Sequence, residues 1–239
     1  MEPKDRIYVA IDTNDVKKAL DLVEKLSGKV GGFKLGLEFF TSVLIQLWLD
    51  ASLQYHFDRL MSTVRANLFW DGKFHDIPNT VGGAAKGLEP LAPRFFNVHA
   101  SAGTQAIKEA VRNKGGSKVL AVTLLTSFDE KLSYDWFFHQ VPRDIVPHWA
   151  SLAVDAGVDG LVCSPADLEH INRNEKLVHV RKMTPGIRPL WSVKGDQARI
   201  MTPKQALEAG ATWMVIGRPI TECSDGPEKA VERILEEIS

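Results

Sequence analysis

Short apolar runs alternate with helical patterns along this whole sequence. Eight runs rich in β-branched and aromatic residues are separated by longer segments whose apolar residues recur every three or four positions, as in residues 14–26. The eight runs are residues 7–12, 32–36, 67–73, 95–100, 119–125, 160–164, 178–184 and 213–218. Strict alternation of this kind is typical of βα units around a parallel sheet, and eight units predict a closed (β/α)8 TIM barrel of the α/β class.

Length and composition fit one such barrel. The chain has 239 residues, of which 44% are hydrophobic and 25% charged, and no linker rich in Pro, Gly or Ser divides it. Because a chain of this length can bury one sizeable core, residues 1–239 are predicted to form a single catalytic domain.

Charge and cysteine content argue against several classes of partner. The formal net charge of −1 provides no strong field for nucleic acid or an anionic membrane. Cys163 and Cys223 lack metal-ligand spacing and are too few for a disulfide framework, which fits a reducing compartment. The first residues resemble no signal peptide, and no apolar run approaches the roughly 20 residues of a spanning helix. We therefore expect a cytoplasmic protein with no nucleic-acid or membrane partner.

Polar and charged residues cluster where the apolar runs end. They are Asp12, Lys34, Asp71, Lys73, His99, Thr126, Ser164, Thr184 and Arg218. The carboxyl ends of barrel strands form a single face, and that face holds the active site in barrel enzymes. These residues are therefore expected to meet in one pocket, although they are distant in the chain.

The densest group lies in the stretch FWDGKFHDIPNT, residues 69–80. Asp71 and Lys73 are two positions apart, so their side chains leave the same side of a strand and are neighbours. Opposite charges at this distance favour the charged form of both groups. Asp76 follows the strand, and Pro78 suits the first turn of a helix. Taken alone, the spacing also fits a surface salt bridge followed by a helix N-terminus.

The other residues of this stretch favour an active site over a surface salt bridge. DGKFHDIPNT resembles the active-site signature D-L-K-F-H-D-I-P-N-T of orotidine 5′-phosphate decarboxylases. Other segments resemble the same family in the same order, from about residue 7 to residue 222: VAIDT, FKLGLEFFT, NVHAS, AVTLLTS, AGVDGLVCSP, TPGIRP, GDQARIMTP and MVIGRPIT. The resemblance implies a carboxy-lyase that converts orotidine 5′-phosphate to UMP in pyrimidine biosynthesis, without a metal or organic cofactor.

The resemblance also implies catalytic roles. Lys73 faces C6 of the pyrimidine as the main cation and donates a proton to it. Asp71 orients Lys73 and crowds the departing carboxylate, while Lys34 extends the alternating charges and contacts the ribose. Three residues reach across a twofold interface into the partner's pocket, which implies a homodimer with shared sites: Asp76, Ile77 and Thr80.

Substrate binding is implied at eight further positions, namely Asp12, Thr126, Ser127, Pro185, Arg188, Gln197, Gly217 and Arg218. Asp12 is expected to bind ribose hydroxyls, and Thr126 with Ser127 to meet the pyrimidine edge. Arg188, Gln197, Gly217 and Arg218 are expected at the phosphate, where glycine lets main-chain N–H groups approach an anion and arginine adds charged donors. His75 and His99 are interpreted as structural imidazoles with satisfied hydrogen bonds.

The sequence departs from the family pattern in four places, one of which is the stretch 133–149, rich in Trp, Phe and Pro. Gly72 stands where a large apolar residue is usual, and it is expected to leave a gap outside the strand that costs up to ~2–5 kcal/mol if it stays empty. Residues 41–66 form a longer connection whose apolar residues could refill that gap. Arg181 and Lys182 replace apolar residues in the seventh strand.

Two alternative functions remain open from sequence alone. One is a related sugar-phosphate decarboxylase or aldolase that uses Mg²⁺, although FHDIPNT and TPGIRP favour the nucleotide-specific enzymes. The other is a catalytically impaired nucleotide-binding protein on the same scaffold. Measuring UMP formation in EDTA, and comparing UMP binding with turnover, separates these hypotheses.

Overall fold

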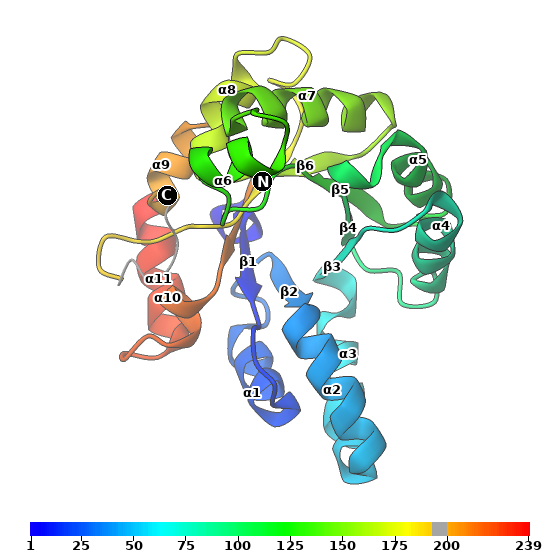
Figure 1. Cartoon of the computed structure of the whole chain (residues 1–239). Coiled ribbons are helices and arrows are strands. Elements are labelled where there is room, and N and C mark those ends of the chain that lie inside the picture. Colours follow the sequence, from blue (N-terminus) through cyan, green and yellow to red (C-terminus); the bar gives the residue numbers. More distant parts are fainter. Residues whose placement is uncertain (193–199) are drawn as a thin grey trace.

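The computed structural model describes residues 1–192 and 200–239, and its eight parallel strands close into a barrel, as predicted (Figure 1). The strands are β1 (Ile7–Ala10), β2 (Gly32–Gly36), β3 (Leu68–Phe74), β4 (Phe95–His99), β5 (Lys118–Val122), β6 (Gly160–Val162), β7 (Lys182–Thr184) and β8 (Trp213–Ile216). Each strand pairs with the next in the chain, and β8 pairs with β1. All eight carboxyl ends therefore face the same way.

Helices surround the strands, but their alternation with strands is not strict. They are α1 (Val16–Leu26), α2 (Leu37–Leu49), α3 (Gln54–Val64), α4 (Pro78–Gly87), α5 (Thr104–Arg112), α6 (Glu130–Trp136), α7 (Pro142–Asp155), α8 (Leu168–Asn172), α9 (Pro203–Glu208), α10 (Arg218–Thr221) and α11 (Pro227–Ile238). Pairs of helices follow β2, β5 and β8, so the predicted one-to-one alternation is wrong there. Within residues 1–192 and 200–239, no helix is long and apolar enough to cross a membrane.

Local sequence signals account for the helix ends. Asp15 caps α1, since its carboxylate accepts hydrogen bonds from the main-chain N–H groups of Lys17 and Lys18. The buried face of α1 repeats every three or four residues, as the sequence pattern predicted. Pro78 is the first residue of α4, where its missing N–H and fixed φ are best tolerated.

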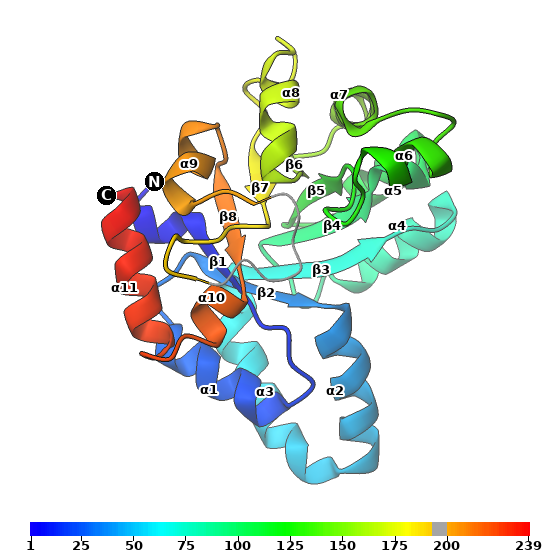
Figure 2. The same ribbon diagram turned by 60° about the vertical axis from the view of Figure 1, so that its left-hand side comes forward.

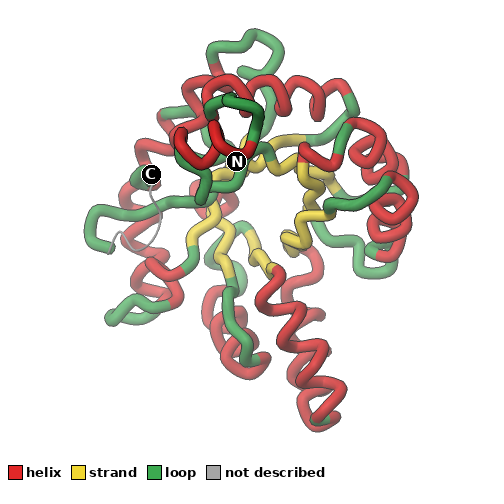
Figure 3. Tube along the Cα trace, in the orientation of Figure 1, coloured by secondary structure: helices red, strands yellow, loops and turns green. Residues whose placement is uncertain are grey.

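The barrel core has two layers, which the inner ring of strands in Figure 3 separates. Outward-facing strand residues pack against the helices. Inward-facing residues fill the barrel itself: Tyr8, Ala10, Phe69, Phe95, Leu120, Met183, Trp213 and Val215. The rings of Phe95 and Trp213 meet edge to face at 4.8 Å between centroids. These side chains therefore fill the interior of the barrel.

The first half of the predicted strand 178–184 is wrong, because residues 178–180 form turns and β7 begins at Lys182. The Lys182 side chain is 1% exposed, and its Nζ donates hydrogen bonds of 2.9 Å to the carbonyl oxygens of Val178 and Val180. Burial lowers the pKa of this amine. The lysine thus ties the preceding turn to the strand.

The expected gap beside Gly72 is absent. A Cβ at this position would lie 2.9 Å from Nε1 of Trp70 and 3.0 Å from Cε1 of Phe74, so the two rings already occupy that space. Trp70 in turn stacks on Phe40 at 3.7 Å between centroids. Neighbouring aromatic residues therefore compensate for the glycine.

The connection at residues 41–66 forms a helical hairpin from α2 and α3, which projects from the ring of helices in Figures 1 and 2. Val43, Leu60 and Val64 anchor it in the core. Five large apolar residues near its outer end remain exposed: Leu44, Ile45, Trp48, Leu49 and Tyr55.

Candidate active site

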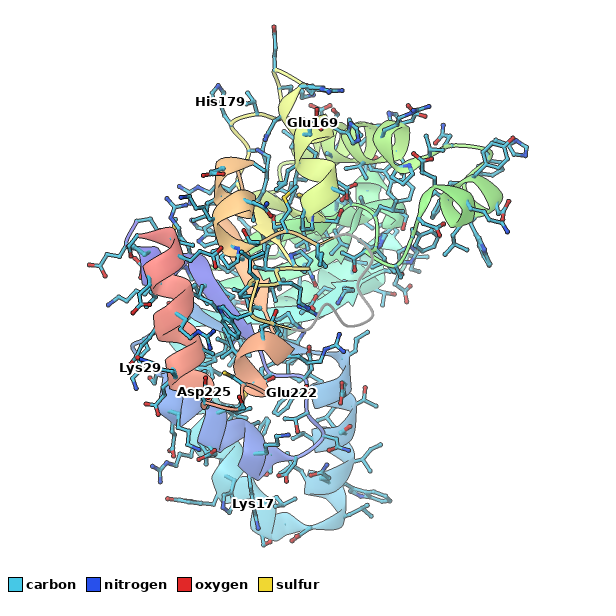
Figure 4. All side chains as sticks on the ribbon, turned by 90° about the vertical axis from the view of Figure 1, so that its left-hand side faces the viewer. Lys17, Lys29, Glu169, His179, Glu222 and Asp225 are labelled. Carbon is cyan, nitrogen blue, oxygen red and sulfur yellow. The ribbon has the colours of Figure 1, made fainter. Side chains whose placement is uncertain are left out.

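A cavity of about 490 Å³ lies at the carboxyl ends of the strands. Nine of the predicted site residues line it: Asp12, Lys34, Asp71, Lys73, Thr126, Pro185, Arg188, Gly217 and Arg218. Glu38 and Glu222, which sequence analysis did not select, also line it, and Figure 4 labels Glu222 at the end of α10. The volume is typical of small-molecule sites.

Four charged side chains form a continuous chain of ion pairs on one side of this cavity. Lys34 Nζ lies 2.9 Å from Asp12 Oδ1 and 3.2 Å from Asp71 Oδ2. Lys73 Nζ lies 2.8 Å from Asp71 Oδ1. Two ammonium groups and two carboxylates alternate, so the group carries no net charge while Lys73 stands at its end.

Burial and ion pairing oppose each other at the centre of this chain. Burial alone would raise the pKa of Asp71, but Lys34 and Lys73 outweigh it and lower that pKa below its usual range. Burial alone would likewise lower the pKa of Lys34, but Asp71 and Asp12 raise it. Both groups are therefore ionised near neutral pH, although their side chains are only 9% and 12% exposed.

The expected proximity of Asp71 and Lys73 is confirmed, and an irregular strand produces it. The register between β3 and β4 shifts between Trp70 and Phe74, which marks a bulge. Lys73 has φ = 47°, in the left-handed region that side chains rarely adopt. Lys73 is therefore held in a backbone conformation that needs support from its surroundings.

Asn97 on β4 provides hydrogen bonds at this bulge, and sequence analysis missed it. Its Nδ2 donates to Asp71 Oδ1 at 2.6 Å, and its Oδ1 accepts from the main-chain N–H of Lys73 at 2.7 Å. The residue is fully buried. A signal was available, since Asn97 is an amide inside an apolar strand, on the same face as the inward-pointing Phe95.

Residues after β7 and β8 line another part of the cavity, next to Asp12, since a Cβ added at Gly217 would lie 3.9 Å from Asp12 Oδ2. Arg188 is 7% exposed, and its Nη1 donates to the carbonyl oxygen of Ile187 at 2.9 Å. The main-chain N–H of Arg188 donates a hydrogen bond to the carbonyl oxygen of Met201, and Ile187 forms a β-bridge with Met201. Residues 187–188 therefore lie beside Met201. Gly217 and Arg218 enter from the end of β8 and the start of α10. Gln197 lies outside the described residues.

Four predicted site residues do not line this cavity: Asp76, Ile77, Thr80 and Ser127. All four are exposed, and Asp76 Oδ1 accepts a hydrogen bond of 2.7 Å from the N–H of Ile77. Asp12, rather than Asp76, completes the set of charges within this chain. The expectation that the residues near Asp76 serve a partner's cavity stays a prediction.

His75 and His99 are linked through Ser101, in agreement with their structural interpretation. Ser101 Oγ lies 2.9 Å from His75 Nε2 and 2.6 Å from His99 Nδ1. Nδ1 of His99 also accepts from the N–H of Ser101, so its proton is on Nε2. Burial, together with the charges of His75 and Lys73, lowers the pKa of His99 to about 4. This histidine is therefore neutral at physiological pH.

Among the described residues, no group of three or more His, Cys, Asp or Glu side chains is arranged to hold a metal ion. A family model described as "Orotidine 5'-phosphate decarboxylase / HUMPS family" matches residues 5–234. The chain belongs to this family.

Individual relatives agree with the family match. The orotidine 5′-phosphate decarboxylase of Paramagnetospirillum magneticum is 42% identical, over 97% of each chain. That of Moorella thermoacetica is also 42% identical, over 100% of this chain and 94% of the relative. The crystal structure of the orotidine 5′-phosphate decarboxylase from Lactobacillus acidophilus superposes with a TM-score of 0.76 and 32% identity, over 98% of each chain. The resemblance predicted from the motifs is confirmed.

Proposed function

We propose that this chain decarboxylates orotidine 5′-phosphate to UMP, as the names of its relatives say of them. The observation that carries the proposal is the chain of ion pairs that ends at Lys73 inside the cavity. The reaction needs a fixed positive charge that can also supply a proton, and a lysine held by a buried carboxylate has both properties.

Loss of CO₂ from the pyrimidine creates the charge that this site has to stabilise. The C6–carboxylate bond breaks, CO₂ leaves, and the electron pair stays on C6 in the plane of the ring, where the π system cannot delocalise it. In our proposal Lys73 faces this pair and then donates a proton to C6, and its neutral amine regains a proton from solvent. A preorganised charge in a site shielded from water interacts more strongly than it would in bulk water.

The neighbouring charges have supporting roles in this proposal. Asp71 holds the Lys73 ammonium at 2.8 Å and directs its own carboxylate toward the departing one. Lys34 keeps Asp71 and Asp12 in place from the other side, and Asp12 and Lys34 contact the ribose. Thr126 contacts the pyrimidine.

The phosphate is proposed to bind in the part of the cavity beside the ends of β7 and β8. Pro185, Arg188, Gly217 and Arg218 line it there, and Gln197 is proposed as a further contact. Two guanidinium groups suit a dianion because each provides paired, charged donors. Binding energy at this non-reacting group can be used to position the ring against Lys73.

We further propose that residues 1–239 form one barrel domain and that two copies form a homodimer. Asp76, Ile77 and Thr80 would each enter the partner's cavity. Their exposure and their absence from the cavity of their own chain support this arrangement. We propose a cytoplasmic location and no metal or organic cofactor.

The first test follows UMP formation from orotidine 5′-phosphate, with and without EDTA, beside a Lys73→Ala variant. We expect activity that EDTA leaves intact, and a decrease of at least about 10⁴-fold in the variant, since both the stabilising charge and the general acid are lost. Similar activity in the variant contradicts the role of Lys73. Activity that EDTA removes favours the Mg²⁺-dependent alternative, and tight UMP binding without turnover favours the inactive scaffold.

The second test mixes Lys73→Ala chains with Asp76→Ala chains. A hybrid dimer contains one site with both native residues, so random exchange should restore about a quarter of the wild-type activity. Each variant alone is the control. If activity does not return although exchange of differently labelled subunits is demonstrated, the shared site is wrong.

A further inference from the structure

We propose that Asn97 is a positioning residue for decarboxylation, whose side-chain amide fixes both the Asp71 carboxylate and the main chain of Lys73. The inference rests on the function proposed above and extends it to a residue outside the cavity lining. Asn97 does not line the cavity, so its proposed role is to hold the Lys73 ammonium in place and not to contact the substrate.

Both ends of the Asn97 amide are used. Nδ2 donates to Asp71 Oδ1 at 2.6 Å, while Oδ1 accepts from the N–H of Lys73 at 2.7 Å. These partners define the orientation of the amide, because a reversed amide would place its oxygen against a carboxylate and its NH₂ group against an N–H donor. Asn97 is fully buried, so water does not compete for either hydrogen bond.

The two hydrogen bonds act at the two points that decide where the Lys73 ammonium lies. Asp71 Oδ1 is the atom that also accepts from Lys73 Nζ at 2.8 Å, so Asn97 limits rotation of the carboxylate that holds the ammonium. The second hydrogen bond is at the bulge, where the β3–β4 register shifts and Lys73 has φ = 47°. There the Asn97 side chain accepts the N–H of Lys73. One amide therefore fixes the main chain of Lys73 directly and its ammonium group through Asp71.

Asn97→Asp is the most informative substitution, because it changes one hydrogen bond and keeps the shape. An introduced carboxylate can still accept the N–H of Lys73, but its second oxygen faces Asp71 Oδ1 in place of a donor. We expect kcat to fall by about 10- to 100-fold near neutral pH, since the ammonium is displaced, while KM changes little.

The pH profile separates a positioning role from a structural one. Two carboxyl groups in contact raise the pKa at which one of them takes up a proton, and the protonated group can then donate to the other. The activity of Asn97→Asp should therefore rise toward the wild-type value as the pH falls, over a range in which the wild-type activity does not rise. Asn97→Ala lacks any group that can donate, so its kcat should be low at every pH.

Asn172→Asp is a matched control. The Asn172 amide on α8 is also largely buried, and its Nδ2 donates to the carbonyl oxygen of Ala209 at 2.7 Å, but the residue does not line the cavity. Its substitution should lower the stability and leave the pH profile of kcat unchanged. UMP binding and near-UV circular dichroism report whether each variant is folded.

Three results would overturn the inference. The first is a kcat for Asn97→Asp within about twofold of wild type, with the same pH profile. The second is a loss that appears only in KM. The third is failure of both Asn97 variants to fold, which would make Asn97 a residue of the fold alone. Wild-type chains without turnover would instead overturn the proposed function, and this inference with it.

Discussion

The inner face of the barrel has two tiers with opposite character, which lie only two residues apart along β3 and β4. Phe69 and Phe95 belong to the lower, apolar tier. Two positions further along β3 and β4 are Asp71 and Asn97, which hydrogen-bond to each other in the upper tier. Side chains alternate between the faces of a strand, so both tiers point inward and differ only in height.

The difference teaches how one barrel separates stability from chemistry. The lower tier gains free energy from burial of apolar surface and needs no partner of a particular charge. The upper tier holds buried charges, which are tolerable only because each finds an opposite charge or a hydrogen bond. Substitutions in the lower tier should therefore affect unfolding, and those in the upper tier should affect rate.

Phe95→Ala gives the largest expected effect on stability. Phe95 is fully buried and contacts the rings of Tyr8, Phe69 and Trp213. Truncation should lower the free energy of unfolding by about 3–5 kcal/mol, measured by urea denaturation. The kcat/KM of the folded fraction should change far less. If kcat/KM of the folded fraction fell strongly while the free energy of unfolding changed little, the lower tier would not act mainly on stability.

Gly36→Ala tests the upper tier with a single methyl group. A Cβ at Gly36 would lie 3.0 Å from Lys34 Nζ, so the ammonium has to shift relative to the carboxylates of Asp12 and Asp71. We expect kcat/KM to fall by up to about 100-fold with little change in unfolding, because the flexible end of a lysine yields easily. Gly87→Ala is the control, since no atom lies within 4 Å of that added Cβ. Equal activity of the two variants would contradict the prediction.

Gly72→Leu sharpens the comparison on the outer face of β3. A side chain there would meet Trp70 and Phe74, so the substitution should destabilise the fold by about 1–3 kcal/mol, although a large apolar residue is usual at this position. The same substitution in a Trp70→Ala background should cost less, as a double-mutant cycle can measure. Stabilisation by Gly72→Leu would mean that a gap exists after all.

Near neutral pH the titration of His99 should have the smallest of these effects, because its contribution to stability changes only at lower pH. Its pKa is about 4 in the folded chain and about 6.5 when unfolded, so the unfolded state binds more protons between these values. The contribution of His99 to stability is complete above about 6.5 and is lost as the pH falls toward about 4. His99→Gln should reduce the slope of unfolding free energy against pH in this window. An unchanged slope would contradict the lowered pKa of His99 in the folded chain.

Much of the fold could be predicted from the sequence because each βα unit carries its own pattern. The apolar runs located all eight strands, and Asp15 and Pro78 marked helix starts. The error at residues 178–180 has a tertiary cause. Alternating valines there look like a strand, but the buried Lys182 binds the carbonyl groups of Val178 and Val180 and stabilises turns. Periodicity alone carries no information about such a contact.

Sequence motifs predicted which residues belong to the candidate site. They did not predict which of these residues contact one another, because those contacts depend on the fold. Motif positions supplied Lys34, Asp71 and Lys73, which the fold brings into contact. The motif could not reveal that Asp12 pairs with Lys34, because that pairing depends on the β1–β2 register. Asn97 was missed because its role depends on a bulge in a neighbouring strand.

The burial of Lys182 makes it an internal reporter of unfolding. Acylating reagents modify amines that reach solvent, so exposed Lys17 at the start of α1 (Figure 4) should react at once in the native protein. Lys182, at 1% exposure, can react only when the turn before β7 opens. Mass spectrometry of the labelled peptides would therefore time the opening of the β6–β7 side of the barrel without any engineered probe.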